Sequence, residues 1–381
     1  MTTLALVNGR LLTDDGFVEG QVVIVEAGRI RDVVSRDSKW SADRKYDLLG
    51  NKLLPGFIDT QVNGGGGVLF NDDPSVDSII EIGRAHRRFG TVGFLPTLIS
   101  DDLHVVSRAV HAVQAAIERG VPGVLGIHIE GPFLSAERKG VHDASKLRWL
   151  SEDGIGLLTS LKGGKTLVTL APECTTPDII RKLTQAGVIV SAGHTNATYA
   201  QIKEALAHGL TGFTHLFNAM SQLTGREPGA VGAALEDSTS WCGVILDGSH
   251  VHPAVLRIAL RCRPRDRFML VTDAMPGVGS DRKRFTLQGR TMTVEGLVCL
   301  DQNGRLAGSN MDMASAVRNA VSMLGLDLAE AVRMASTYPA AFLRLDHEFG
   351  RIAPGYRANL VLADEDLNVV ATWIDGKNGD E

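Results

Sequence analysis

The chain has 381 residues, a length that fits one (β/α) barrel of about 250 residues together with a smaller module. Its residues are 44% hydrophobic and 22% charged, which is ordinary for an α/β enzyme. The net charge of −5 argues against a nucleic-acid partner. The N-terminus lacks a basic segment followed by an apolar run, and no stretch approaches about 18 uninterrupted apolar residues. A soluble, unexported protein without a membrane partner is therefore expected.

The number and spacing of the cysteines indicate the redox compartment and the kind of metal site to expect. The four cysteines are widely separated and show no CxxC pairing: Cys174, Cys242, Cys262 and Cys299. This spacing suggests neither a disulfide framework nor a thiolate zinc site. A reducing, cytoplasmic compartment is the natural expectation.

The two ends of the chain share a strand-rich pattern. Residues 1–52 alternate short β-branched runs with turns such as Asn8-Gly9, which predicts a small antiparallel sheet module. Residues 350–381 again consist of short strand-like runs. Because these segments flank the central part of the chain, we expect them to pair into one small β-sandwich domain, with residues 53–349 forming a second domain.

Between the two ends, strand-like and helical patterns alternate. Helical stretches such as 75–89 and 102–118 separate most of the strand-like runs, and a β-like excursion at 285–300 follows the last of them. Eight βα repeats predict an α/β fold, a closed (β/α)8 TIM-like barrel with its active-site groups at the carboxyl ends of the strands. The eight runs begin at Leu53 and continue at 91–100, 124–130, 166–173, 188–194, 212–218, 241–247 and 269–273.

Two histidines end consecutive strand-like runs. His194 follows the run 188–192, and His215 follows Gly212-Phe213-Thr214 after an intervening helical stretch. The strands of such a strand–helix–strand unit should be parallel neighbours, so both histidines leave the same end of the sheet and can reach one ion. A lone histidine at a strand end is more often a structural residue, so a metal site requires a third ligand.

Glu130 is the best candidate for the third ligand. It ends the run 124–130, where an ionised glutamate buried in a barrel mouth would be costly without a partner, and a divalent cation is the obvious partner. Glu130, His194 and His215 give three nitrogen and oxygen ligands with a position left for water. This is the pattern of a catalytic rather than a structural zinc site.

Asp273 ends the eighth strand-like run. In a closed barrel the eighth strand lies next to the first, so this carboxylate can face the open coordination position. A carboxylate within hydrogen-bond reach of a water there can accept its proton and later return it to a leaving nitrogen. Asp273 is therefore the predicted catalytic base.

Six short motifs occur in order at the ends of these runs: Pro55-Gly56-Phe57-Ile58-Asp59, His128-Ile129-Glu130-Gly131-Pro132, Gly193-His194-Thr195, Thr214-His215-Leu216-Phe217-Asn218-Ala219-Met220, Asp247-Gly248-Ser249-His250 and Thr272-Asp273-Ala274. Together they resemble the amidohydrolase superfamily and, within it, the N-acetylglucosamine-6-phosphate deacetylase family, over the barrel and both tails. The resemblance implies metal-dependent hydrolysis of the acetamide of N-acetylglucosamine 6-phosphate to glucosamine 6-phosphate and acetate. Such a reaction serves amino-sugar catabolism and cell-wall sugar recycling.

The resemblance also implies roles for residues outside the metal set. His142 is similar to the family residue near the substrate carbonyl, where it would polarise the acetamide as a second catalytic group. Arg226 is similar to the family arginine that reaches the substrate phosphate from a neighbouring subunit, which implies a homodimer. The substrate-binding residues implied in this way are Gln61, Asn63, Val141, His142, Asn218, Ala219, Arg226, Asp247, His250, Leu306, Ala307, Gly308 and Ser309.

One motif departs from the superfamily pattern. The first strand usually carries His-x-His, whereas this chain has Gln61-Val62-Asn63. Amides are poor zinc ligands compared with imidazole, and the same departure in part of the deacetylase family goes with one firmly bound metal. We therefore expect one zinc ion per subunit, and the departure argues against a second.

Other functions of the same fold remain as alternatives. A cyclic-amide hydrolase often uses a lysine that bridges two metals, and a deaminase uses the first-strand histidines. Glu130, Gln61 and Asn63 fit neither pattern well. A phosphosugar-binding barrel that has lost catalysis is a third alternative, which the presence of both Asp273 and a full ligand set opposes.

Overall fold

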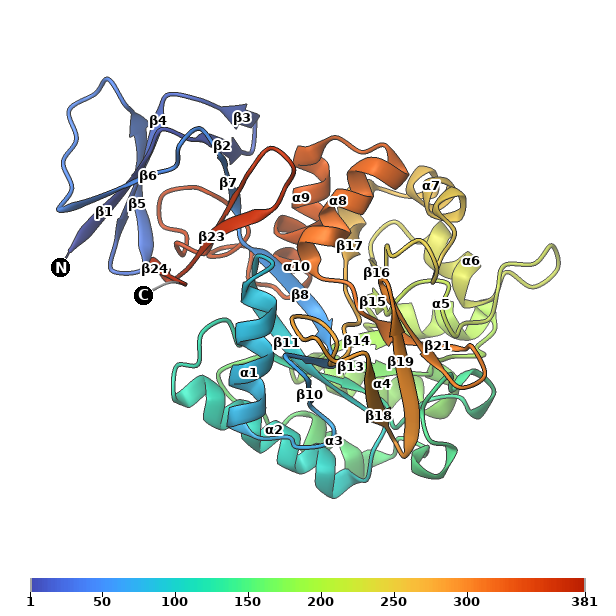
Figure 1. The fold of residues 1–381 in the computed structure, drawn as a ribbon. Helices are drawn as coiled ribbons and strands as arrows, with labels where there is room; N and C mark the ends of the chain where they lie inside the picture. Colours follow the sequence, from blue (N-terminus) through green and yellow to red (C-terminus); the bar gives the residue numbers. More distant parts are fainter. Residues whose placement is uncertain (1, 380–381) are drawn as a thin grey trace.

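The computed structural model describes residues 2–379, which form a helix-covered barrel with a smaller β-rich unit at one side (Figure 1). Eight parallel strands follow one another around the barrel in the order β17-β16-β15-β14-β13-β12-β11-β8. The predicted barrel class is confirmed, with each strand shorter than or similar to its predicted run. The strands are β8 (Phe57–Val62), β11 (Thr91–Ile99), β12 (Gly126–Glu130), β13 (Lys165–Leu170), β14 (Ile189–Ala192), β15 (Gly212–Phe213), β16 (Trp241–Val244) and β17 (Phe268–Leu270).

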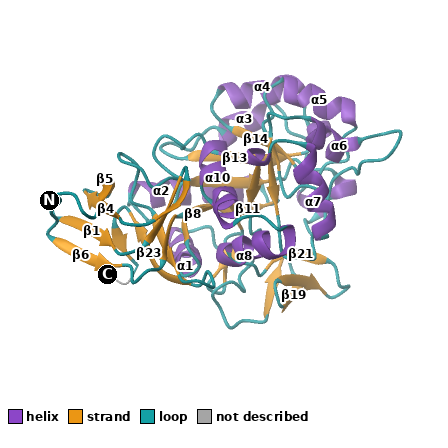
Figure 2. Cartoon of the chain, turned by 90° about the horizontal axis from the view of Figure 1, so that it is seen from above, coloured by secondary structure: helices purple, strands orange, loops and turns teal. Residues whose placement is uncertain are grey.

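Helices surround the barrel strands (Figure 2). Several begin at side-chain caps, such as Ser75 before α1 and the Thr198–Gln201 capping box before α5. No helix within residues 2–379 has the length and apolar character needed to cross a bilayer. The helices are α1 (Val76–Arg87), α2 (Leu103–Glu118), α3 (Glu152–Leu158), α4 (Pro177–Gln185), α5 (Tyr199–Ala207), α6 (Gly229–Glu236), α7 (Pro253–Cys262), α8 (Met313–Leu324), α9 (Leu328–Ala335) and α10 (Thr337–Phe342).

The smaller unit is a sandwich of two sheets built from both ends of the chain. One sheet has the order β5-β4-β1-β6, and the other has the order β24-β23-β22-β7-β2-β3. Apolar side chains of both sheets meet in one buried cluster around Trp373, which confirms the predicted sandwich. The strands are β1 (Thr3–Val7), β2 (Arg10–Thr13), β3 (Gly16–Val18), β4 (Gln21–Glu26), β5 (Arg29–Ser35), β6 (Arg44–Asp47), β7 (Lys52–Pro55), β22 (Leu360–Ala363), β23 (Val369–Ile374) and β24 (Lys377–Asn378).

The pairing inside this sandwich differs from the antiparallel module that the sequence predicts. β1 and β6 pair in parallel, and so do β2 and β7. Asn8-Gly9 is a corner rather than a hairpin turn, because β1 and β2 belong to different sheets. The domain boundaries at 52/53 and 349/350 stay a prediction.

A four-stranded antiparallel sheet covers one side of the barrel mouth. Its order is β18-β19-β20-β21, as expected from the β-like excursion after the last barrel strand. The strands are β18 (Arg284–Leu287), β19 (Arg290–Glu295), β20 (Val298–Asp301) and β21 (Leu306–Ser309), and we call this sheet the flap (Figure 2). A small hairpin of β9 (Gly64–Gly65) and β10 (Val68–Leu69) contributes Leu69 to the hydrophobic cluster beneath it.

Replacing Trp373 by alanine should destabilise the sandwich. Its side chain is 1% exposed and packs edge-on against Tyr46, so truncation leaves a cavity that costs about 3–5 kcal/mol of unfolding free energy. Val370, on the same strand, is 50% exposed, and Val370→Ala should change stability by less than about 0.5 kcal/mol. Urea unfolding followed by circular dichroism measures both, and equal midpoints for the two variants would contradict the assigned packing.

Candidate metal and active site

Four polar side chains converge at the carboxyl end of the barrel. Glu130 is the last residue of β12, and His194, His215 and Asp273 follow β14, β15 and β17 within three residues. The carboxyl ends of neighbouring parallel strands open onto the same mouth, so all four side chains lie close together there. The structure thus brings together the four residues that the sequence pattern selects.

The backbone is left-handed at three of these positions. The φ angles are 47° at His194, 34° at His215 and 53° at Asp273. Non-glycine residues rarely adopt this region, which costs on the order of 1–3 kcal/mol each and is concentrated at functional sites. The surrounding fold therefore holds these three residues in a conformation that their own preferences disfavour.

Three ligand-type atoms meet at one point. The Oε1 atom of Glu130 lies 2.9 Å from Nε2 of His215 and 3.2 Å from Nε2 of His194, and the two nitrogens are 3.1 Å apart. Each of the three residues offers a ligand atom within 4.8 Å of the others, and all three are buried. The cluster could therefore hold a metal ion.

The hydrogen bonding of His194 fits a ligand role. Its Nδ1 atom lies 2.9 Å from the backbone carbonyl of Arg138, which can only accept, so Nδ1 carries a proton. When the ring is protonated on both nitrogens, Nε2 donates to Glu130. When the ring is neutral, the Nδ1 proton leaves a lone pair on Nε2, which can then bind a metal ion. A carbonyl that orients a ligating histidine in this way is a common feature of protein metal sites.

Electrostatics favour an ionised Glu130. Burial opposes ionisation, but hydrogen bonds from His194 and His215 outweigh it and hold the pKa of the Glu130 carboxyl well below its ordinary value. Burial also disfavours the cationic form of His215, yet the neighbouring Glu130 raises the pKa of that imidazole. This cluster therefore attracts positive charge, whether a proton or a metal cation.

The first-strand amides contact the two carboxylates. The amide nitrogen of Gln61 donates to both oxygens of Glu130, at 3.3 and 3.2 Å, and to Oδ1 of Asp273 at 3.1 Å. The amide nitrogen of Asn63 donates to the same Oδ1 atom at 2.7 Å. Both residues sit behind the carboxylates and do not line the cavity described below, so their predicted contact with substrate stays a prediction.

Asp273 is buried close to a second carboxylate. Burial, and then the negative charge of Glu130, raise the pKa of Asp273 to about 6. A carboxylate with such a pKa accepts a proton more readily near neutral pH than an exposed aspartate does. The environment therefore suits the predicted base.

A cavity of about 340 Å³ opens above these residues. It includes the metal cluster and Asp273, so the chemistry and the space for a small ligand coincide. Most of the predicted contact residues line it: Val141, His142, Asn218, Ala219, His250, Leu306 and Gly308.

Besides Gln61 and Asn63, four further predicted contact residues lie outside that lining. Asp247 accepts a hydrogen bond from His250 Nδ1 at 2.6 Å, and so supports a residue that does line the cavity. Ser309 donates to the carbonyl of Thr272, and Ala307, on the flap strand β21, is buried in the hydrophobic cluster of the flap. Arg226 is exposed on the loop 221–228, away from the cavity of its own chain.

The structure also places residues in the cavity that sequence reasoning missed. Arg138 follows the Glu130 motif closely in sequence, and its position near His194 could have been suspected from that spacing. Its side chain donates to Asn196 at 2.9 Å, and Asn196 donates to Glu137. The residues in this group are Ile99, Glu137, Arg138, Gly140, Ile245 and Met275.

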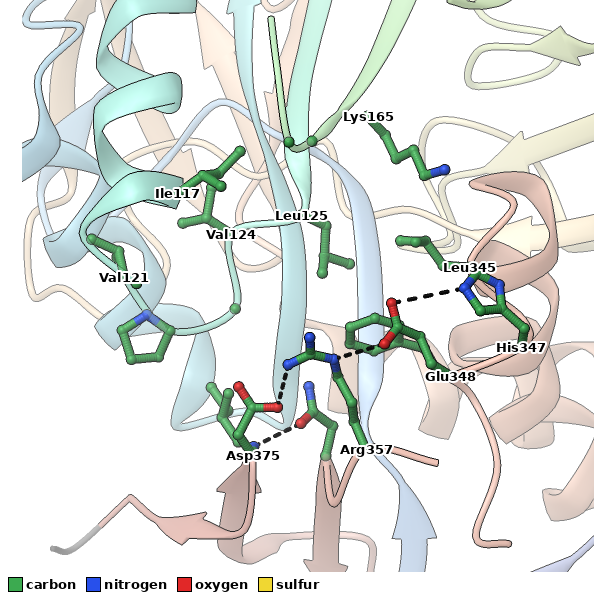
Figure 3. Close-up of a pocket in the computed structure, with 18 residues that line it drawn as sticks. Ile117, Val121, Val124, Leu125, Lys165, Leu345, His347, Glu348, Arg357 and Asp375 are labelled. Atoms are coloured by element: carbon green, nitrogen blue, oxygen red, sulfur yellow. Dashed lines mark hydrogen bonds and ion pairs between the residues drawn. The ribbon is translucent and has the colours of Figure 1, made fainter. Parts of the chain in front are cut away.

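A larger cavity, of about 560 Å³, lies at the opposite end of the barrel (Figure 3). Arg357 spans this space and pairs with Glu348 at 3.1 Å and with Asp375 at 2.7 Å. The arginine thus forms ion pairs with both acids at the junction between the barrel and the sandwich. The amino-terminal end of such a barrel usually serves stability, and we assign no chemistry to it.

Comparison with known proteins places the chain in a family. Residues 53–379 match the model of the amidohydrolase family. The chain belongs to the amidohydrolase family. This confirms the resemblance carried by the six motifs, and it agrees with a metal-dependent site built from Glu130, His194 and His215.

Individual relatives narrow the comparison. The chain is 45% identical to the N-acetylgalactosamine-6-phosphate deacetylase of Shewanella sp. (strain ANA-3), over 97% of this chain and 94% of that one. It is 35% identical to the N-acetylglucosamine-6-phosphate deacetylase of Haemophilus influenzae, over 98% of each. The crystal structure of N-acetylglucosamine-6-phosphate deacetylase from Pasteurella multocida superposes with a TM-score of 0.95 at 36% identity, covering 99% of both chains.

A further buried acid, Asp59, lies at the seam that closes the barrel. One carboxyl oxygen accepts from the hydroxyl of Thr272 at 2.5 Å, and the other accepts from the amides of Gln61 and Thr272 at 3.1 and 3.3 Å. Burial raises the pKa of Asp59 to about 7, although these hydrogen bonds act in the opposite direction. Between about pH 4 and about pH 7, Asp59 therefore keeps its proton in the folded protein and has released it in the unfolded chain.

Asp59 should make stability fall with rising pH. Between about pH 4 and about pH 7 the unfolded state binds fewer protons, so its contribution lowers the free energy of unfolding by up to about 1.4 kcal/mol per pH unit. Asp59→Asn keeps the shape and should flatten this fall, whereas Asp37→Asn at the exposed surface should not. Urea unfolding at about pH 5 and about pH 7.5 tests this, and identical slopes in all three proteins would refute it.

Proposed function

We propose that this chain hydrolyses the acetamide of N-acetylglucosamine 6-phosphate to glucosamine 6-phosphate and acetate, in amino-sugar catabolism and cell-wall sugar recycling. One observation carries the proposal: Glu130, His194 and His215 converge on one point beside Asp273, in a chain whose relatives are sugar-phosphate deacetylases. The adjoining cavity of about 340 Å³ has room for a phosphorylated monosaccharide. A cytoplasmic enzyme fits this role.

We propose that the three residues hold one Zn²⁺ ion per subunit. Two imidazoles and a carboxylate are a common ligand set of catalytic zinc, and when bound there the ion acts as a Lewis acid toward water and the acyl oxygen. Support for a single ion comes from Gln61 and Asn63, the amide nitrogens of which donate to the carboxylates. These residues stand where the superfamily usually has two histidines, and an amide oxygen is a poorer zinc ligand than an imidazole nitrogen.

The chain's own residues supply the proton transfers. Oδ1 of Asp273 is held by Gln61 and Asn63, and no hydrogen bond joins Oδ2 to another residue within 2–379. In the proposed reaction Asp273 takes a proton from the attacking water and returns it to the sugar nitrogen as the carbon–nitrogen bond breaks. His142 donates a hydrogen bond to the acyl oxygen, where negative charge develops.

The phosphate contacts involve a second subunit in this proposal. Asn218, Ala219 and His250 line the cavity, and in this proposal they contact the phosphate and the sugar. Arg226 lies on a loop between β15 and α6 that projects from the barrel (Figure 1). Arg226 is exposed and does not line the cavity of its own chain, and we propose a homodimer in which this arginine reaches the phosphate bound by the partner.

The galactosamine epimer is a second candidate substrate. The relative with 45% identity is an N-acetylgalactosamine-6-phosphate deacetylase, whereas the N-acetylglucosamine-6-phosphate deacetylase of Haemophilus influenzae is 35% identical. The two sugars differ only in the configuration at C4, so both offer the same acetamide and phosphate. The proposed chemistry is the same for either sugar.

Acetate release from the purified, zinc-loaded protein tests the proposal. We expect about one zinc per chain and a kcat/KM for N-acetylglucosamine 6-phosphate that exceeds that of the unphosphorylated sugar by more than about tenfold, or about 1.4 kcal/mol. A higher kcat/KM for the galactosamine epimer would favour the second candidate. No acetate from either phosphorylated sugar would refute deacetylation, and weak phosphate discrimination would refute the Arg226 and His250 assignments.

Asp273→Asn should lower kcat by about 100-fold or more and leave KM near the wild-type value, because the amide cannot accept the proton. Zinc content should not change, which separates a base from a ligand. Asp281→Asn, at an exposed position near the flap, is the control and should retain full activity. Unchanged turnover in Asp273→Asn would remove this residue from the mechanism.

A further inference from the structure

His142 needs a defined proton position to act as a hydrogen-bond donor. Its imidazole is 2% exposed, lines the cavity, and lies 4.4 Å from the ring of His194. A neutral imidazole carries its proton on only one nitrogen, and the other nitrogen can only accept. Which nitrogen faces the cavity as a donor therefore decides whether His142 can stabilise the acyl oxygen.

Ser100 determines that proton position. The backbone amide of Ser100 donates to Nδ1 of His142 at 3.3 Å, and the Ser100 hydroxyl oxygen lies 2.7 Å from the same nitrogen. A backbone amide cannot accept a hydrogen bond, so Nδ1 must present its lone pair and the proton resides on Nε2. No hydrogen bond joins Nε2 to another residue within 2–379, which leaves it available to a ligand.

Gly131 leaves the space that this contact requires. It follows Glu130 directly and has a φ of 88°, which favours glycine. A Cβ atom there would lie 2.2 Å from the Ser100 hydroxyl oxygen. The chain that delivers the metal-site carboxylate therefore also makes room for the group that orients His142.

The flap holds both sides of the Ser100–His142 pair. Its first turn has φ angles of 49° at Gln288 and 76° at Gly289, typical of a tight two-residue hairpin turn. The amide of Gln288 donates to the carbonyl of Ser100 at 2.7 Å, and Arg290 donates to the carbonyl of Val141. Beneath this turn, apolar flap residues pack against Ile99 and Val141, the neighbours of the pair.

We propose that Ser100 and Gln288 are positioning residues, which hold His142 with its Nε2 proton directed toward the acyl oxygen of the substrate. The inference rests on the proposed function, because that reaction defines the oxygen on which the donor acts. A donor aimed at developing negative charge contributes to kcat rather than to ground-state binding. The flap is thereby part of the reaction machinery and does not only cover the cavity.

Two variants of the zinc-loaded full chain test the proposal. Ser100→Ala removes the hydroxyl and keeps the backbone amide, and Gln288→Glu keeps the shape but removes the donor to the Ser100 carbonyl. Each should lower kcat about tenfold with KM within about twofold of wild type. Thr286→Ala, on the exposed side of the same hairpin, is the matched control and should behave as wild type.

A proton-detected nitrogen spectrum of ring-labelled histidines supplies a readout that a merely structural role would not move. The wild-type His142 signal, assigned by its loss in His142→Gln, should show the proton on Nε2. Ser100→Ala, which keeps the backbone amide, should retain this tautomer but show a shifted Nδ1 resonance, because the contact with the hydroxyl is lost. A wild-type proton on Nδ1 overturns the proposal, and so does wild-type kcat in both variants. The proposal is also overturned if Ser100→Ala, Gln288→Glu and the control Thr286→Ala all lose kcat and melting temperature to the same extent.

Different results would contradict the deacetylase activity and the positioning role of Ser100 and Gln288. If the wild-type protein releases no acetate, the proposed function fails, while the spectrum still decides the tautomer of His142. If acetate is released but the wild-type spectrum shows the other tautomer, only the positioning role fails.

Discussion

The site depends on one buried negative charge, the carboxylate of Glu130. Burying a carboxylate is costly unless it is compensated, and the compensation here comes from His194, His215 and Gln61, which all contact it. These partners come from three other barrel strands, so closure of the barrel is what brings them together. The left-handed backbone at both histidines is held in place by the same closure.

The sequence predicted the parts of this arrangement that leave a local pattern. Strand ends followed by polar residues located Glu130, His194, His215 and Asp273, because parallel strands of a barrel open onto one mouth. Side-chain contacts between distant segments leave no such pattern, so the link from Gln288 to Ser100 was not predicted. The parallel pairings in the sandwich were missed for the same reason, since they join strands that are far apart in the chain.

The charged groups at the two ends of the barrel distinguish a reactive site from a structural junction. At the carboxyl end, carboxylates and imidazoles share hydrogen bonds beside an open cavity, and the pKa of Asp273 is raised to about 6. At the other end, Arg357 is paired with two acids in a larger cavity. Volume alone would favour the second cavity, whereas the chemistry of the lining selects the first.

The first barrel strand is continuous with the sandwich, because β7 runs into β8 across Gly56. All four residues of β7 are buried, and the strand pairs with β22 on one side and with β2 on the other. An isolated barrel that kept β7 but lacked β2 and β22 would expose the apolar edges of this strand, which can associate with other chains. The tails therefore cover β7, which leads directly into β8 and so to Gln61 and Asn63, and the barrel cannot be separated from them without risking aggregation.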